Sequence, residues 1–221
     1  DFSPGEATAM NFLKVARPGK GDEVIDFGCG TGRGSLMLAL LGNLNVTMVD
    51  FTTNSLDEDV HDMLTTQSHA MRFVQADLRR PMDVFAKYGY CTDVMEHLPP
   101  EDVDAALSHI LKSAQHVYFQ ISTVPDHMGS LIGEELHLTV KPYEWWKEKL
   151  KALDAIIGWS HFDDYTASFY VTAWTKGSEL VQYGSVNTEH EPIKDQVRHN
   201  STQGYFEVGP YDKQDTPVMI L

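Results

Sequence analysis

The feature that most limits the fold is a regular alternation of strand-like and helix-like segments along the first half of the chain. Helical spacing of apolar residues predicts helices over 5–16, 34–42, 56–64 and 99–113. Short apolar runs bounded by turn residues predict strands over 23–27, 45–50, 71–77, 88–93 and 116–122. Strands that alternate with helices favour an α/β fold, with a parallel sheet covered by helices on both faces.

The pattern changes after the fifth strand. A helix is expected over 141–153, with Pro142 at its start, and two strand-like runs follow at 155–163 and 167–174. Only three residues separate these runs, so no crossover helix fits between them and they must pair antiparallel. We therefore predict a seven-stranded, doubly wound, mostly parallel sheet that ends in an antiparallel hairpin.

The pattern weakens from Thr175 onward, where polar and turn-forming residues dominate. We divide the chain into a folded domain over 1–175 and a polar extension over 176–221. The extension ends in the apolar stretch "PVMIL", which is typical of the start of a buried strand. We expect the chain to be a fragment, with a further domain following Leu221.

Charge and cysteine content limit the partners. Acidic residues outnumber basic ones by 32 to 17, which gives a formal net charge of −15. Nucleic acids and anionic membranes are bound through basic surfaces, so neither is an expected partner. The two cysteines, Cys29 and Cys91, suit a reducing compartment. We expect a cytoplasmic protein that acts on a small molecule.

A glycine-rich turn, "VIDFGCGTGRGS" at residues 24–35, follows the first predicted strand. The dinucleotide fingerprint G-x-G-x-x-G requires a third glycine at 33, or a glycine or alanine at 35. The chain has Arg33 and Ser35 at these positions. The turn therefore fits a nicotinamide dinucleotide poorly.

The spacing that the turn does match is Asp26-x-Gly28-x-Gly30-x-Gly32, and here the sequence resembles class I S-adenosylmethionine-dependent methyltransferases. The segment "DVMEHLPPEDV" at 93–103 is similar to the fourth-strand motif of small-molecule members such as the ubiquinone-pathway enzymes. The resemblance implies a Rossmann-like methyltransferase fold over the folded domain. It also implies transfer of a methyl group from S-adenosylmethionine to an oxygen or nitrogen atom of a small acceptor.

Acidic residues at the strand ends support the same cofactor without the resemblance. Four predicted strands end at or near a carboxylate: Asp26, Asp50, Asp77 and Asp93. The carboxyl ends of parallel strands meet at one edge of a sheet, where ligands bind. Four carboxylates there favour a cationic, hydroxyl-rich ligand such as S-adenosylmethionine and disfavour a pyrophosphate.

The resemblance implies a role for each residue near the methionine end of the cofactor. Gly28, Gly30 and Gly32 let the backbone approach the methionyl part and the ribose. Asp26 lies beneath the methionine end, and Asp93 faces the ammonium group.

Other residues are implied on the nucleoside side. Asp50 accepts hydrogen bonds from both ribose hydroxyls, and Phe51 packs on the adenine ring unless it is an ordinary core aromatic. Asp77 and the backbone of Leu78 hold the adenine edge. Arg33 either pairs with the cofactor carboxylate or faces solvent.

Histidines are the candidates for removing a proton from the acceptor, because the imidazole pKa lies close to working pH. His97, just past the fourth strand, is the first candidate and His137 the second, with His127 also considered. A structural, hydrogen-bonding role is the alternative for each of them.

Asp93, Glu96, His97 and the distant His137 also resemble the metal-binding set of small-RNA 2′-O-methyltransferases and some ubiquinone-pathway enzymes. Carboxylate and imidazole ligands suit a divalent ion that activates a hydroxyl acceptor. A Glu-His pair after this strand is common in proteins that bind no metal. A divalent metal is therefore not favoured, and no metal ligand is assigned from the sequence.

Two other functions remain open. A NAD-dependent oxidoreductase would use a related fold, although the glycine spacing and the acidic strand ends count against it. A non-catalytic S-adenosylmethionine-binding module of a longer protein would bind the cofactor without turnover. "DVME" stands at 93–96, where methyltransferases of DNA amino groups carry a DPPY-like tetrapeptide, which disfavours that substrate.

Overall fold

The computed structural model describes residues 4–66, 70–126, 129 and 133–173, together with three short strands near the C-terminus. The chain divides into two compact units, Asp1–Thr188 and Glu189–Leu221. Within the described residues, no helix is long and apolar enough to cross a membrane.

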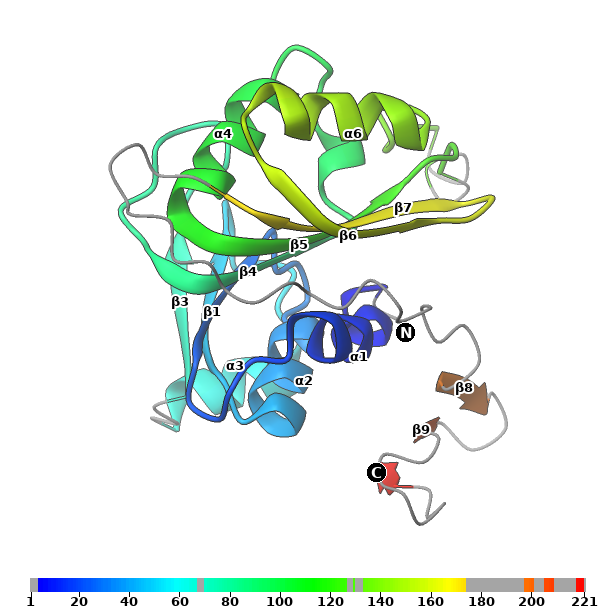
Figure 1. Ribbon diagram of the computed structural model, residues 1–221. Coiled ribbons are helices and arrows are strands. Elements are labelled where there is room, and N and C mark those ends of the chain that lie inside the picture. The colour runs from blue at the N-terminus through cyan, green and yellow to red at the C-terminus, as the bar shows by residue number, and fades with distance from the viewer. Residues whose placement is uncertain are drawn as a thin grey trace. The chain divides into compact units, whose positions relative to one another are not determined.

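The larger unit is built on one seven-stranded sheet (Figure 1). Its strands are β1 (Glu23–Phe27), β2 (Asn45–Asp50), β3 (Met71–Gln75), β4 (Ala86–Thr92), β5 (Ala114–Ser122), β6 (Ile156–Phe162) and β7 (Thr166–Thr172). The strand order is β3-β2-β1-β4-β5-β7-β6. Neighbouring strands from β3 to β5 are parallel, whereas β7 runs antiparallel to both β5 and β6. The predicted mostly parallel sheet with an antiparallel end is confirmed.

Helices cover both faces of this sheet (Figure 1). They are α1 (Pro4–Ala16), α2 (Arg33–Gly42), α3 (Glu58–Thr65), α4 (Val103–Ser113) and α6 (Tyr143–Ala152), with a short 3-10 helix, η1 (Met95–His97). On one face, α1, α2 and α3 bury Phe12, Leu38 and Val60 against the sheet. On the other face, α4 and α6 bury Ile110 and Trp146.

The α4 helix begins later than its apolar spacing predicts. The N–H of Asp102 donates to the carbonyl of Pro99 at 2.9 Å, which closes a turn at 99–102 ahead of the helix. Neither Pro99 nor Pro100 has an N–H to contribute to a helix. The first helical residue is therefore Val103.

The hairpin of β6 and β7 is closed by one side chain. A carboxylate oxygen of Asp163 accepts hydrogen bonds from the N–H groups of Tyr165, at 2.9 Å, and Thr166, at 2.8 Å. Such a side-chain acceptor satisfies turn amides that the ladder leaves unpaired. The short link that predicted an antiparallel pair is thus a tight turn.

The smaller unit contains a three-stranded antiparallel sheet in the order β10-β9-β8. Its strands are β8 (Val197–Asn200), β9 (Tyr205–Val208) and β10 (Val218–Ile220). The apolar stretch near the C-terminus is therefore a strand, as its composition predicts. Most of 176–221 lies outside the described residues, and the predicted boundary at 175 stays a prediction.

Candidate active site

The glycine-rich turn joins the end of β1 to α2 with three residues at positive φ. Gly28, Gly30 and Gly32 have φ values of +72°, +52° and +76°, which glycine adopts without steric cost. A Cβ at Gly28 would lie 2.6 Å from the side chain of Val94, and one at Gly32 would lie 2.6 Å from that of Val60. Gly30 differs, because no other atom of the described residues lies within 4 Å of its Cβ position. The turn therefore presents bare backbone at Gly30.

Asp50 ends β2 beside this turn and is almost fully buried. One of its carboxylate oxygens accepts the N–H of Gly30 at 2.9 Å, and the other accepts the N–H of Phe51 at 2.7 Å. These bonds hold the carboxylate against the turn. The oxygen that faces Phe51 also accepts the N–H of Thr52 at 3.4 Å. A carboxylate accepts about four hydrogen bonds, so the oxygen that faces Gly30 retains a lone pair for a hydroxyl group of a ligand.

Phe51 follows Asp50 and leaves 72% of its surface exposed. The alternative of an ordinary core aromatic is therefore wrong. The ring belongs to neither of the two hydrophobic clusters that pack on the sheet, and nothing in the local sequence pattern distinguishes this position from a buried one. An exposed ring beside Asp50 is available to stack on a base.

Asp26 lies beneath the turn with only 4% of its surface exposed. Its carboxylate accepts a hydrogen bond of 2.6 Å from the hydroxyl of Ser35, which ties β1 to α2. Burial, reinforced by the charge of Asp50, raises the pKa of Asp26 to about 7, although the Ser35 hydrogen bond opposes this rise. Its predicted role beneath the methionine end stays a prediction.

Asp77 follows β3 and is paired with Arg79. The Nε and Nη2 atoms of Arg79 lie 2.9 Å from its two carboxylate oxygens, and these hydrogen bonds lower the pKa of Asp77. Leu78 is buried, and its carbonyl oxygen lies 3.3 Å from the Nδ1 of His109. The contact of Asp77 with adenine stays a prediction. If it forms, Asp77 makes it while paired with Arg79, an ion pair that the sequence did not predict.

Arg33, at the start of α2, also has partners within the protein. Its Nε donates to the carboxylate of Asp57, and its Nη1 lies 3.8 Å from Glu6. The guanidinium thus links the segment before α3 to α1. The sequence suggested two roles for Arg33: pairing with the cofactor carboxylate, or facing solvent. In either role, Arg33 would have to give up or share its ion pairs with Asp57 and Glu6.

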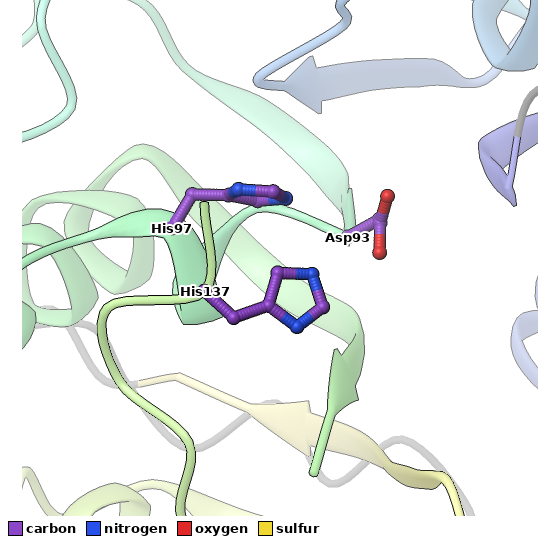
Figure 2. A group of neighbouring side chains, drawn as sticks. All are labelled: Asp93, His97 and His137. Carbon is purple, nitrogen blue, oxygen red and sulfur yellow. The ribbon is translucent and has the colours of Figure 1, made fainter. Parts of the chain in front are cut away.

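A second cluster lies past the end of β4 and contains Asp93, His97 and His137. Figure 2 shows the rings of His97 and His137 extending toward the side of the cluster on which Asp93 lies. Each offers one potential ligand atom, and the three atoms lie within 4.8 Å of one another. The ring centroids of the two histidines are 4.8 Å apart, with the ring planes at 88°. The structure thus brings together the two histidines predicted to act on the acceptor and an aspartate predicted to face the cofactor.

Backbone carbonyl groups orient both histidine rings. The Nδ1 of His97 lies 3.0 Å from the carbonyl oxygen of Leu136, and the Nδ1 of His137 lies 2.8 Å from that of Val124. A ring nitrogen that faces a carbonyl oxygen carries the proton, so the lone pair of each neutral ring is on Nε2. The backbone at Asp93 has a φ of +58°, the left-handed region, where β4 ends.

Glu96 lies at the base of the same cluster and is completely buried. Its Oε1 accepts the N–H of Ser122 at 2.6 Å, and its backbone carbonyl accepts the N–H of Thr139 at 2.9 Å. Burial, together with the nearby charge of Asp93, raises the pKa of Glu96 to about 8. Glu96 therefore connects η1 to β5 and to the segment that carries His137.

Sequence reasoning missed the groups that position the histidines. The carbonyls of Val124 and Leu136 have no sequence signature, since any residue supplies a carbonyl. Glu96 was named only within the metal-like set, and its buried, connecting position was not foreseen. His127, the third histidine considered, lies outside the described residues.

Residues 24–115 match the family model described as a methyltransferase domain. This range runs from β1 to the start of β5 and includes the glycine turn and the Asp93–His97 segment. No curated protein matches the chain at a significant level. The predicted resemblance to class I methyltransferases is confirmed by the family match and by the strand order.

Several solved methyltransferases share the fold. Phosphoethanolamine N-methyltransferase 2 of Haemonchus contortus, in complex with S-adenosyl-L-methionine, is 17% identical, with a TM-score of 0.57 over 68% of this chain. Magnesium protoporphyrin IX methyltransferase of Synechocystis PCC 6803, with bound SAH, is 19% identical, with a TM-score of 0.60 over 76% of this chain and 83% of that chain. An O-methyltransferase family protein of Burkholderia thailandensis is 11% identical, with a TM-score of 0.57 over 77% of this chain and 58% of that chain. The chain spans 37% of the length of the Haemonchus enzyme.

Proposed function

We propose that the chain, whose residues 24–115 match a methyltransferase domain, transfers a methyl group from S-adenosylmethionine to a small acceptor molecule. The observation that carries this proposal is the arrangement around Gly30. Bare backbone at Gly30 lies directly beside the Asp50 carboxylate, and the exposed ring of Phe51 follows. Backbone, carboxylate and aromatic ring in this order suit a nucleoside with free hydroxyl groups and no phosphate.

The cofactor would lie along the carboxyl edge of β1, β2 and β4. Asp50 would accept the ribose hydroxyls, Phe51 would stack on the adenine, and Gly30 would admit the thioether or sulfonium part. Two of the structural neighbours are complexes with S-adenosyl-L-methionine or SAH, which supports the same ligand here. Asp77 and Leu78 remain the proposed partners of the adenine edge.

The acceptor would approach from the side of the Asp93 cluster. In methyl transfer, the acceptor atom forms a bond to the methyl carbon as the bond from that carbon to sulfur breaks. The sulfur thereby loses its positive charge, and the acceptor releases a proton if it began as a hydroxyl or an amine. His97 and His137 are the proposed groups that act on this proton, because their rings lie together and extend toward Asp93 (Figure 2).

The neighbours include an N-methyltransferase, a porphyrin methyltransferase and an O-methyltransferase family protein, so the fold is compatible with several acceptor classes. A net charge of −15 disfavours nucleic acid and anionic membrane as partners. We therefore propose a small molecule as the acceptor. We also propose a cytoplasmic location, because the two cysteines suit a reducing compartment.

Calorimetric titration with S-adenosylmethionine, S-adenosylhomocysteine and NAD, in parallel, tests the cofactor. We expect the first two to bind and NAD not to bind. Asp50→Asn should weaken that binding, since an amide cannot accept at both positions. The matched control is Asp22→Asn, because Asp22 also accepts a backbone N–H, from Gly19, but does so in the turn before β1. Binding of NAD alone would overturn the proposal, and cofactor binding without methylation of any acceptor would favour a non-catalytic module.

A further inference from the structure

We propose that the methyl acceptor is an apolar compound without an anionic group, and that it binds along the half of the sheet edge formed by β4, β5, β7 and β6. The inference rests on the proposed function and names the substrate class of the same site. Its evidence is the distribution of exposed apolar and charged side chains at that edge, which the proposed cofactor contacts do not use.

The strand order separates the two substrates along one edge of the sheet. The proposed cofactor contacts lie at the ends of β1 and β2, and Asp93 follows β4. The strands β5, β7 and β6 lie beyond β4. Ser122, which ends β5, is paired with Thr166, which begins β7, so the β6–β7 turn lies at the same edge as the end of β5. An acceptor that approaches past Asp93 therefore meets the ends of β5, β7 and β6.

Large apolar side chains are exposed along this half of the edge. Tyr165, in the β6–β7 turn, and Phe162, which ends β6, leave 66% and 61% of their surfaces exposed. Leu136 and Leu138, on either side of His137, are also exposed. We call Leu136, Leu138, Phe162 and Tyr165 the apolar rim. A single exposed apolar side chain is ordinary, whereas several that gather at one place indicate a binding surface.

Hydrogen bonds hold the parts of the apolar rim beside one another. The N–H of Thr123 donates to the carbonyl of Tyr165 at 2.8 Å. The carbonyl oxygen of the next residue, Val124, lies 2.8 Å from the Nδ1 of His137. The segment that carries the two leucines therefore lies beside the turn that carries Tyr165. The apolar rim belongs to one region of the edge, next to the groups proposed to act on the acceptor.

The other exposed large apolar side chains of the described residues do not gather in this way. Phe51 is already proposed to contact adenine. Leu40 lies in α2, Phe85 precedes β4, and Ile156 begins β6. Ile156 and Phe162 thus lie at opposite ends of one strand, and only Phe162 is at the edge where the acceptor would bind.

The charges beside the apolar rim disfavour an anionic acceptor. The connection after β4, residues 93–102, contains four carboxylates and no lysine or arginine, although Asp102 is paired with Arg79. The connection after β5, residues 123–141, contains three carboxylates and one lysine. The β6–β7 turn, residues 163–165, adds two carboxylates. A carboxylate or phosphate on the acceptor would be repelled here, whereas a cationic group would be attracted.

Three probes that share a phenol ring test this preference. Tyramine carries a positive charge, para-ethylphenol carries none, and para-hydroxyphenylpropionate carries a negative charge. Ligand-observed NMR titration of the full chain at low salt, with and without S-adenosylhomocysteine, measures the Kd of each probe. We expect tyramine to bind at least as tightly as para-ethylphenol, and para-hydroxyphenylpropionate to bind at least about 10-fold more weakly than tyramine. Added salt should narrow that difference.

Substitutions in the apolar rim test the location. Tyr165→Ser and Leu138→Ser should each weaken the binding of tyramine and para-ethylphenol by about 3-fold to 10-fold through lost apolar contact. The matched control is Ile156→Ser, which removes an exposed apolar side chain from the opposite end of β6 and should leave both affinities unchanged. All three positions are exposed, so the urea midpoints should stay close to that of wild type.

Three results would overturn the acceptor class. They are wild-type probe affinity in both rim variants, binding of para-hydroxyphenylpropionate as tight as that of tyramine, and no binding of any probe. Sedimentation of the same preparations detects the other occupant of an apolar surface, a second copy of the chain. A dimer that dissociates in both rim variants would also overturn the acceptor class.

Titration of the same preparations with S-adenosylhomocysteine separates this proposal from the proposed function. Binding of S-adenosylhomocysteine together with any of the overturning results would remove the acceptor class and leave the methyltransferase. Probe binding that Tyr165→Ser weakens, without any binding of S-adenosylhomocysteine, would keep the apolar site and remove the proposed function.

Discussion

Replacement of Gly30 by alanine distinguishes a glycine that serves the fold from one that serves a ligand. Gly30 has a φ of +52°, and apart from Gly30 and its two chain neighbours no atom of the described residues lies within 4 Å of its Cβ position. Gly21 provides a matched control, because it has a φ of +81° and equally open surroundings. Gly21 lies in the turn before β1, whereas Gly30 lies in the turn after it.

The two substitutions should cost similar stability and differ in cofactor binding. An L-residue in the left-handed region costs roughly 1–2 kcal/mol, and neither methyl group adds a clash with the described protein atoms. Both variants should therefore lose about 1–2 kcal/mol of unfolding free energy. If the cofactor packs on Gly30, the added methyl overpacks that contact by about 1–3 kcal/mol. That range corresponds to a Kd about 5-fold to 150-fold weaker for Gly30→Ala alone.

Urea unfolding and calorimetric titration with S-adenosylhomocysteine measure the two quantities on the same preparations. We expect Gly21→Ala to bind S-adenosylhomocysteine as the wild type does, and Gly30→Ala to bind it at least about 5-fold more weakly. If the two variants bind S-adenosylhomocysteine equally well, the cofactor does not pack on Gly30, and the argument from its open surroundings fails.

Two further predictions concern the neighbours of Gly30. Phe51→Ala should leave the unfolding free energy within about 0.5 kcal/mol of wild type, because the ring is exposed. The same variant should weaken S-adenosylhomocysteine binding by about 1–3 kcal/mol through lost stacking. Calorimetry measures this affinity, with Phe85→Ala, which removes another exposed ring, as the control; equal affinities in Phe51→Ala and wild type would contradict the prediction. Burial raises the pKa of Asp26 to about 7 from an ordinary 3.8, so the folded form holds a proton that the unfolded form has lost between about pH 4 and pH 7, and the unfolding free energy falls as the pH rises through that window. Asp26→Asn still accepts the Ser35 hydroxyl but cannot titrate, so urea unfolding across this window should show a smaller fall than in wild type; an identical pH dependence would contradict the assignment.

The order of strands and helices could be predicted from the sequence because it is encoded locally. Helical and strand-like spacing identified every element of the larger sheet, and the three-residue link at 164–166 required an antiparallel pair. The ends of the elements were predicted less exactly. The helix expected from residue 99 begins at Val103, because the proline and acidic residues at 99–102 suit a turn as well as the first turn of a helix. The glycine spacing at 28, 30 and 32 identified the methyltransferase turn for the same local reason.

The sequence by itself also determined which residues reach the carboxyl edge of the sheet, since a strand end is a local property. Only the tertiary structure decided what each of them faces there. Asp77 is paired with Arg79, Phe51 is exposed, and His137 lies beside His97 although 39 residues separate them along the chain. Such positions depend on contacts between segments that are distant in sequence. The ring orientations depend further on two backbone carbonyls, and no residue type records where a carbonyl will point.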